Sequence, residues 1–132
     1  MDRDKPNLGE ILGATVMTPN IKETIKPYIE IFDYHVISEK TIPNELANLW
    51  KTKAHYKAES KIIAPKNKSY PWIRFILADE VVNYKAMTSY GWHSLEINVE
   101  SVDQIPDKLI NSNFKIIGDP HQLGMSKSIR AM

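Results

Sequence analysis

Two short segments of this chain combine polar and apolar residues in a pattern that could support ligand chemistry. In the first segment, Ser94, Glu96 and Asn98 alternate with three apolar residues, so a strand there would present the polar side chains on one face. A carboxylate in a semi-enclosed cleft can have a raised pKa and can transfer protons, which makes Glu96 the candidate for acid–base catalysis. Because the sequence shows no partner base, a purely structural role for Glu96 is the alternative.

The second segment is the strongly apolar run at residues 71–78, where Trp72 and Arg74 share one strand face. An arginine fixed in a cleft is suited to bind the carboxylate or phosphate of a ligand. The alternatives for Arg74 are an internal ion pair with Glu96 or a solvated position on the strand. Three tryptophans could provide flat apolar walls for a planar ligand, or could pack in the core: Trp50, Trp72 and Trp92.

Composition excludes several other classes of function. The 132 residues suffice for one domain, and the net charge of +1 gives no general attraction to nucleic acid or acidic membranes. The chain has no cysteine, which excludes disulfides, thiolate metal sites and cysteine nucleophiles. No apolar run approaches the roughly 18 residues of a membrane span, and the first residues lack the apolar core of a signal peptide. We therefore expect a cytoplasmic protein that binds neither nucleic acid nor membrane.

Hydrophobic spacing predicts which elements position these side chains. Strands are expected at residues 12–18, 34–42, 61–64, 71–78, 93–99 and 114–118, with another beginning at 128. Helices are expected at 21–32 and 101–111, with a helical turn at 45–50. Proline lacks the N–H that an interior helical residue donates, so Pro27 is expected to kink or split the first helix and Pro106 to interrupt the second.

The sequence contains this order of elements twice. Residues 13–36 and 94–116 each consist of an alternating run, a capping residue, an amphipathic helix and an aromatic residue that opens a β-branched run. The offset is 81 residues (94 − 13) through the helix and 80 at Tyr34 and Phe114 (114 − 34). Both helices begin with the spacing of a capping box: Asn20 with Glu23, and Ser101 with Gln104. A repeated β-α-β unit restricts where a ligand can bind.

Three stretches carry a family resemblance: the first strand and helix as far as IEIFDYHVISE, then SYPWIRFILAD, then GWHSLEINVESVDQIPDKLINSNFKIIGDP. Their order and patterning resemble the vicinal oxygen chelate superfamily of glyoxalase I, bleomycin-resistance proteins and extradiol dioxygenases. The resemblance implies an α+β fold of two tandem β-α-β-β-β modules that form a curved mixed sheet around a cleft. Module one would span 11–82 and an incomplete module two 91–132, after a flexible N-terminus at 1–10. One departure is Asp33, which stands where the family commonly has glycine.

In this family the helices pack on the convex face of the sheet and the ligand lies in the concave cleft. The resemblance therefore implies that Leu95, Ile97 and Val99 face the helix. The residues expected to bind the ligand in the cleft are Thr15, Met17, Trp72, Arg74, Ser94, Glu96 and Asn98.

Metal-dependent members of the family place a His, Gln or Glu at the start of the first and fifth strands, positions that Gly13 and Ser94 hold here. Neither residue is a good metal ligand, so we expect no metal cofactor. The alternative is a divalent-metal site rearranged around His93 and Glu96, but the required slip of one residue would place Glu96 under the helix. The other histidines show no metal-ligand spacing and are expected to be surface or satisfied polar residues: His35, His55 and His121.

The second module is expected to lack part of its seventh strand and all of its eighth, because the sequence ends at Met132. The family's last metal ligand, usually a glutamate on the eighth strand, would fall beyond that residue. An unpaired sheet edge is a template for pairing with another strand. We therefore expect a homodimer or strand exchange.

These observations predict a glyoxalase-like domain that binds or acts on a small apolar, aromatic or carboxylate-bearing compound without the family's metal. They leave open whether the protein is an enzyme. The first alternative is a metal-dependent lyase, isomerase or dioxygenase of the same superfamily. The second is a non-catalytic interaction module that pairs through its open sheet edge.

Overall fold

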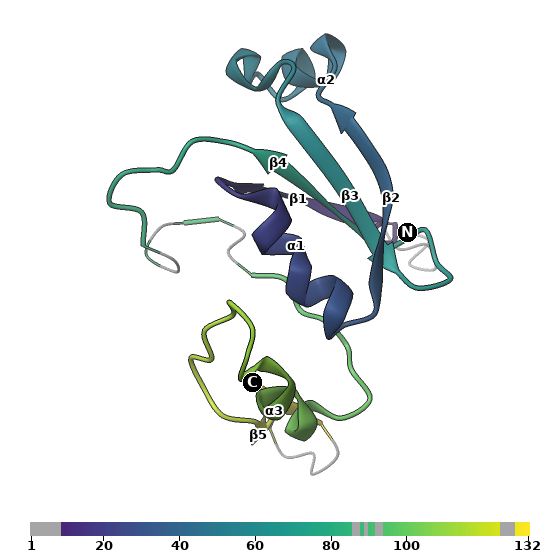
Figure 1. Ribbon diagram of the computed structural model, residues 1–132, viewed down its shortest axis with the longest axis vertical. Coiled ribbons are helices and arrows are strands. Elements are labelled where there is room, and N and C mark those ends of the chain that lie inside the picture. Colours follow the sequence, from purple (N-terminus) through teal and green to yellow (C-terminus); the bar gives the residue numbers. More distant parts are fainter. Residues whose placement is uncertain (1–8, 86–87, 89, 92–93, 125–128) are drawn as a thin grey trace, which may run out of the picture.

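The computed structural model describes residues 9–85, 88, 90–91, 94–124 and 129–132, so most of the predicted flexible N-terminus lies outside the described residues. The fold is α+β, with a four-stranded mixed sheet in the order β1-β4-β3-β2 and a small hairpin of β5 and β6. The helix α1 (Ile21–Glu30) lies across one face of the larger sheet (Figure 1). Strand β1 runs parallel to β4, and the other pairs are antiparallel. The strands are β1 (Gly13–Thr18), β2 (Tyr34–Thr41), β3 (Glu59–Pro65), β4 (Trp72–Leu77), β5 (His121–Gln122) and β6 (Arg130–Ala131).

Helix α1 begins where the sequence predicts because Asn20 caps it. The Asn20 side-chain oxygen accepts a hydrogen bond from the Glu23 N–H at 3.1 Å, which satisfies one of the free N–H groups of the first turn. The Asn20 N–H donates to the Thr18 hydroxyl at 3.2 Å, so Thr18 accepts the bond that a full capping box assigns to Glu23. Ile21 and Ile25 are buried against the sheet, which anchors the helix by its apolar face.

Pro27 lies inside α1, yet the helix is not split there. Because proline has no N–H, the Glu23 carbonyl four residues earlier loses its intrahelical donor. The side-chain amide of Asn113 donates to that carbonyl at 2.8 Å. The second half of the chain therefore supplies the hydrogen bond that Pro27 removes from the helix.

The turn from α1 into β2 passes through Asp33, whose φ is 57°. This left-handed conformation favours glycine, and aspartate is one of the other residues most often found in it. The Asp33 carbonyl accepts a hydrogen bond from the Lys66 N–H at 2.8 Å, and the Lys66 ammonium lies 3.7 Å from the Asp33 carboxylate. The left-handed backbone at residue 33 is therefore the reason that glycine would suit this position. Asp33 adopts the same conformation and is held in it by its two contacts with Lys66.

The two faces of the larger sheet are covered differently. On the α1 face, the main core consists of Ile21, Ile25, Tyr34, Ile63, Ile73 and Phe75. On the opposite face, α2 (Asn44–Leu49) and the 3-10 turn η1 (Lys53–His55) lie at one end, where a second cluster buries Ile42, Ala47 and Ile76. We call the remainder of this surface the open face, and it carries Gly13, Thr15, Met17, Ile62, Trp72 and Arg74.

The second half of the chain does not show a second β-α-β-β-β module. Its described elements are η2 (Val102–Gln104), α3 (Ile105–Leu109) and the β5-β6 hairpin. Residues 94–99 and 114–118 are not strands, so the strand predictions for these described positions are wrong. In the described structure neither segment is paired with a strand, and Ile97 packs against the main core instead.

The predicted helix at 101–111 is also shorter than expected. Ser101 makes no side-chain capping bond, and its carbonyl accepts the Gln104 N–H at 3.4 Å in a 3-10 turn. Pro106 occupies the first turn of α3, where its missing N–H costs no intrahelical hydrogen bond. The α-helix therefore starts beside the proline rather than being interrupted by it. Within the described residues, no helix is long and apolar enough to cross a membrane.

Phe114 and Asn113 together attach the second half to α1. The Phe114 ring lies edge-on to Tyr28 with 5.4 Å between centroids, and 6.4 Å from Phe32. Tyr28 also contacts Tyr34 and Phe75 of the sheet, at 5.8 and 5.5 Å. The aromatic cluster thus connects the segment after α3 to α1 and to the sheet through side chains.

Replacing Asn113 with alanine is expected to lower the free energy of unfolding by about 1 kcal/mol, because the Glu23 carbonyl loses its donor. In a Pro27→Ala background, the N–H of residue 27 can donate to that carbonyl, so Asn113→Ala should cost less. Urea denaturation of the four proteins measures this coupling, and the cost of removing the buried Pro27 ring cancels in the cycle. Equal costs in both backgrounds would show that Asn113 does not compensate for Pro27.

Candidate functional site

The most distinctive group on the open face is Arg74, which lies between two tryptophans. Its guanidinium carbon is 5.0 Å from the centroid of the Trp72 ring and 5.4 Å from that of Trp50. Trp72 and Arg74 are two residues apart in β4, so the pleat directs them to the same face. Trp50 comes from the end of α2, which is fixed on this face by the buried Ala47. We call these three residues, Trp50, Trp72 and Arg74, the Arg74 site.

Within the described residues, no carboxylate forms an ion pair with the Arg74 guanidinium. Arg74 is half-buried, and burial lowers the pKa of its guanidinium below the ordinary value, although an arginine stays charged at neutral pH. In the described part of the chain, the ion pairs join Lys61 to Glu39, Lys66 to Asp33 and Arg130 to Asp103. The predicted alternative of an internal pair between Arg74 and Glu96 is therefore not formed.

This arrangement has a definite chemical preference. Aromatic faces stabilise a cation stacked on them by about 0.5–1 kcal/mol at exposed sites, but they do not satisfy its N–H groups. A guanidinium presents those N–H donors in a planar fork that matches a carboxylate or a phosphate. The site can therefore accept an anion at the edge of Arg74, and Trp50 and Trp72 supply apolar surface beside it.

Gly13 allows the Trp72 indole to lie across β1. Gly13 pairs with Trp72 in the parallel register of β1 and β4. A Cβ atom at residue 13 would stand 2.2 Å from Cδ2 of Trp72, and 2.4 and 2.5 Å from Cε3 and Cε2. The indole therefore occupies the space that a side chain at residue 13 would need. The family resemblance implies a metal ligand at this position, and the Trp72 indole leaves no room for a ligating side chain there.

The structure brings four of the predicted ligand-binding residues together on the open face. Thr15 pairs with Arg74 across β1 and β4, and Met17 pairs with Ile76. Both Thr15 and Met17 are exposed, so they extend the accessible surface from Trp72 and Arg74 to the edge of the sheet.

The remaining predicted site residues do not join this face. Ser94, Glu96 and Asn98 are exposed, but Ile97 in the same segment packs against the core on the α1 side. The assignment of Glu96 as a catalytic residue stays a prediction. His93 and Trp92 lie outside the described residues.

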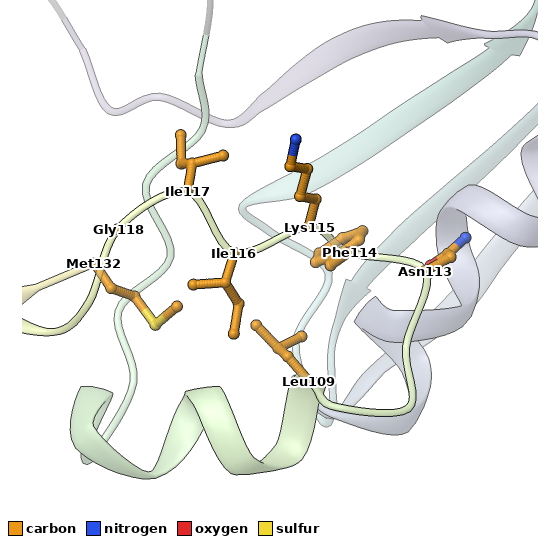
Figure 2. A pocket seen from close by; sticks show the side chains of 8 residues that line it. All are labelled: Leu109, Asn113, Phe114, Lys115, Ile116, Ile117, Gly118 and Met132. Atoms are coloured by element: carbon orange, nitrogen blue, oxygen red, sulfur yellow. The ribbon is translucent and has the colours of Figure 1, made fainter.

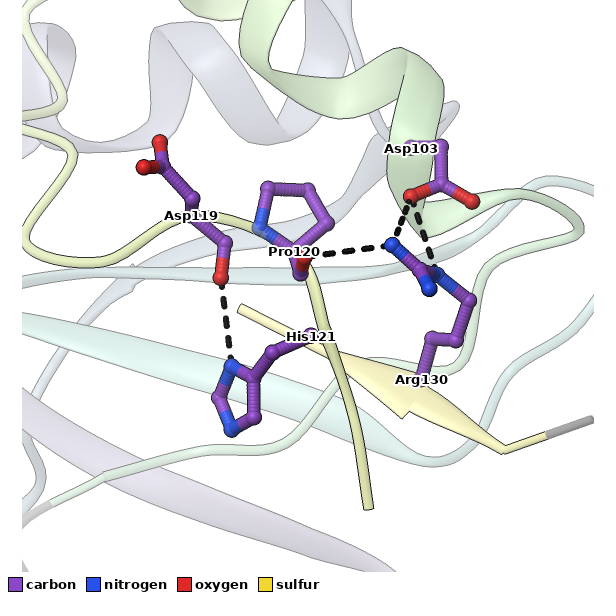
Figure 3. Close-up of polar contacts among 5 residues, drawn as sticks. All are labelled: Asp103, Asp119, Pro120, His121 and Arg130. Atoms are coloured by element: carbon purple, nitrogen blue, oxygen red, sulfur yellow. Dashed lines mark hydrogen bonds and ion pairs between the residues drawn. The ribbon is translucent and has the colours of Figure 1, made fainter. Parts of the chain in front are cut away.

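The other histidines are dispersed over separate elements. His35 is on β2, His55 is in η1 and His121 is on β5. Nδ1 of His121 lies 3.1 Å from the Asp119 carbonyl oxygen, which satisfies one ring nitrogen locally (Figure 3). Among residues 9–85, 88, 90–91, 94–124 and 129–132, no three His, Asp or Glu side chains are grouped so that they could hold a metal ion.

Arg130 provides a comparison with Arg74. Its Nη2 and Nε donate to the same Asp103 carboxylate oxygen at 2.7 and 3.0 Å, and Nη2 also donates to the Pro120 carbonyl at 3.1 Å (Figure 3). These bonds tie β6 to η2. Arg130 therefore has its donors and its charge engaged within the fold, whereas Arg74 contacts two aromatic rings.

Two hollows lie away from the Arg74 site, and the sequence indicated neither. One, of about 340 Å³, lies between α3 and the following extended segment (Figure 2). It is lined by Leu109, Asn113, Phe114, Lys115, Ile116, Ile117, Gly118 and Met132. The other, of about 500 Å³, lies beyond the carboxyl ends of β1 and β4. It is lined by Pro19, Ala54, His55, Leu77, Ala78, Asp79 and Glu80.

Sequence reasoning also missed two contributions to the Arg74 site. The sequence did not predict that Trp50 lies beside Arg74. The two residues are 24 positions apart, at the end of α2 and in β4, and only the tertiary structure brings them together. Sequence reasoning treated Gly13 as an empty ligand position, although a glycine in an alternating run indicates a close approach by another group. Comparison of this chain with protein-family models, with curated proteins and with solved structures finds no match.

Proposed function

We propose that this protein binds a small planar organic anion, such as an aromatic carboxylate, at the Arg74 site. The observation that carries the proposal is the half-buried guanidinium, which lies over the rings of both Trp50 and Trp72 and has no carboxylate partner in the described residues. Removing a cation partly from water costs free energy. An anion bound to the guanidinium would offset that desolvation cost. Exposed Thr15 and Met17 provide further contact area toward the edge of the sheet.

The proposal places the protein with the glyoxalase-like, small-molecule-binding members of the vicinal oxygen chelate superfamily, without their metal. The order β1-α1-β2-β3-β4, with β1 parallel to β4, supports this placement for the first half of the chain. For the second half, the support is the sequence repeat between residues 13–36 and 94–116. The lack of cysteine fits the reducing conditions of the cytoplasm.

The proposal concerns binding and not a reaction. The carboxylate expected to act as an acid or base, Glu96, belongs to a segment on the α1 side of the sheet. No observation in the described structure favours the metal-dependent alternative. The other alternative was a module that pairs through its open sheet edge. It is supported by the edge position of β1, and it is compatible with ligand binding.

The test compares anions with neutral analogues of the same shape. Naphthalene-2-carboxylate and naphthalene-2-carboxamide can be titrated into isotopically labelled protein while the indole N–H signals of Trp50 and Trp72 are followed by NMR. We expect the carboxylate to bind about tenfold to a hundredfold more tightly than the amide, because one charge-assisted hydrogen-bonded contact contributes about 1.5–3 kcal/mol. Equal affinities, or shifts confined to residues outside the open face, would contradict the proposal.

A further inference from the structure

The two edges of the larger sheet differ in how well they are protected against pairing. The edge strands are β1 and β2. Strand β2 has a bulge between Val36 and Ser38 and carries Glu39 and Lys40, which are features that discourage edge-to-edge association. Strand β1 has the sequence GATVMT, without charge, proline or bulge. Met17 in β1 is 59% exposed, and Ile11 and Leu12, just before the strand, are 76% and 56% exposed.

In the described part of the chain, the backbone groups along the outer side of β1 have no hydrogen-bond partner. The carbonyls of Leu12 and Thr18 accept hydrogen bonds from the Trp72 and Ala78 N–H groups at 2.9 and 3.0 Å. The even-numbered residues of β1 therefore direct their backbone groups toward β4. The N–H and carbonyl groups of Gly13, Thr15 and Met17 point the other way, where β1 has no neighbouring strand in the described part of the chain.

We propose that β1 pairs with β1 of a second copy of this chain, antiparallel and about a twofold axis at Thr15. In this register Thr15 faces Thr15 of the partner subunit, and Gly13 faces Met17 of the partner subunit. All facing residues have outward backbone groups, so each forms a hydrogen-bonded pair. Because β1 is uncharged, pairing it with itself brings no like charges together, and threonine pairs favourably with threonine across strands.

The side chains on the open face also favour a second copy as the occupant. The Trp72 indole covers Gly13, and the exposed Met17 of the partner subunit would lie directly opposite Gly13. A methionine sulfur beside an indole is a favourable contact, and the register makes this contact twice. Residues 94–99 of the same chain are not available for this edge, because Ile97 packs on the α1 side.

The joined sheet would place both Arg74 sites on the same side. A twofold axis perpendicular to the sheet keeps the two open faces on one surface. Helix α1 packs mainly against β2, β3 and β4, so the helix itself does not cover the outer edge of β1. The pairing does not depend on ligand binding, and the two proposals can fail separately.

The first experiment uses the absence of cysteine from the chain. Facing residues in a hydrogen-bonded antiparallel pair have Cα atoms about 5.5 Å apart, which is within the range that a disulfide spans. Thr15→Cys is expected to form a covalent dimer on oxidation with glutathione disulfide, as judged by non-reducing electrophoresis. The matched control is Thr41→Cys, an exposed threonine of the other edge strand. Cross-linking at equal rates in the two variants would overturn the proposal.

A second measurement keeps the proposal falsifiable if the cysteine variant does not fold. Size-exclusion chromatography with light scattering is expected to give a dimer for the native chain and a monomer for Met17→Lys, because the lysines would enter the paired edge. Ile37→Lys, at a 41% exposed residue of the β2 bulge, should stay dimeric. Circular dichroism checks that both variants are folded. A native monomer, or a dimer that survives Met17→Lys, would overturn the pairing.

Discussion

Replacing Gly13 with alanine is expected to destabilise the protein by about 1–3 kcal/mol, the usual cost of forcing an additional group into a packed site. The new Cβ would stand 2.2 Å from the Trp72 ring, well inside a van der Waals contact, so the indole must tilt away from β1. Since the same ring stacks on Arg74 at 5.0 Å, the substitution also disturbs the Arg74 site. Urea denaturation at a fixed protein concentration measures the change in the free energy of unfolding.

Two controls identify the cause of the Gly13 effect. Gly118→Ala should change stability little, because no atom lies within 4 Å of the position its Cβ would take. In a Trp72→Ala background, Gly13→Ala should no longer be costly, and it can even be stabilising because alanine restricts the unfolded chain. A Gly13→Ala protein as stable as the native one would show that the indole does not rest on residue 13.

The elements of the first half could be predicted because their signals are local. The spacing of Asn20 and Glu23 predicts the start of α1, and the capping hydrogen bond is present. The alternation in residues 71–78 separates Ile73 and Phe75, which are buried under α1, from Arg74 on the open face. In both cases the residues that form the sequence pattern are also the residues that make the stabilising contacts. The sequence pattern is therefore sufficient to predict the element.

The elements of the second half could not be predicted in this way. The alternation in residues 94–99 is as clear as that in β1, but a strand exists only where a neighbouring strand supplies hydrogen bonds. Here the segment is held by the contact of Ile97 with the main core. Phe114, expected to open a strand, contributes its ring to the cluster around Tyr28. The aromatic residue is thus used for packing between the halves, which the sequence pattern does not distinguish from strand formation.

Only the part of the Arg74 site that lies on β4 could be predicted from the sequence. A spacing of two residues places Trp72 and Arg74 together, and the structure shows them in contact. The position of Trp50 and the need for glycine at residue 13 depend on which elements are neighbours. That β1 lies parallel to β4 with Gly13 opposite Trp72 is a nonlocal fact, and no window of the sequence contains it.

Arg74→Met is expected to reduce the affinity for naphthalene-2-carboxylate about tenfold to a hundredfold while leaving the affinity for the matched carboxamide unchanged. Methionine keeps an apolar side chain between Trp50 and Trp72 but removes the charge and the N–H donors. The loss corresponds to about 1.5–3 kcal/mol for a charge-assisted contact. NMR titration of the indole signals measures both affinities in the same protein.

Two further variants separate the charge from its geometry. Arg74→Lys retains the positive charge without the planar fork, so its affinity for the carboxylate should fall between those of the native protein and Arg74→Met. Lys40→Met removes an exposed cation from the same side of the sheet, and it should leave binding unchanged because Lys40 is not flanked by aromatic rings in the described structure. A similar loss from Lys40→Met would indicate a general electrostatic attraction rather than a site at Arg74.

The competing role for Arg74 is structural, because its stacking connects Trp50 of α2 to Trp72 of β4. A structural role predicts that Arg74→Met lowers thermal stability and weakens the carboxylate and the carboxamide equally, since both would lose the aromatic walls. A ligand-binding role predicts selective loss of the carboxylate with stability nearly retained, because cation–π contacts at exposed sites contribute only about 0.5–1 kcal/mol. The ratio of the two affinities, measured beside the melting temperature, therefore distinguishes a residue that binds an anion from one that only holds α2 on the sheet.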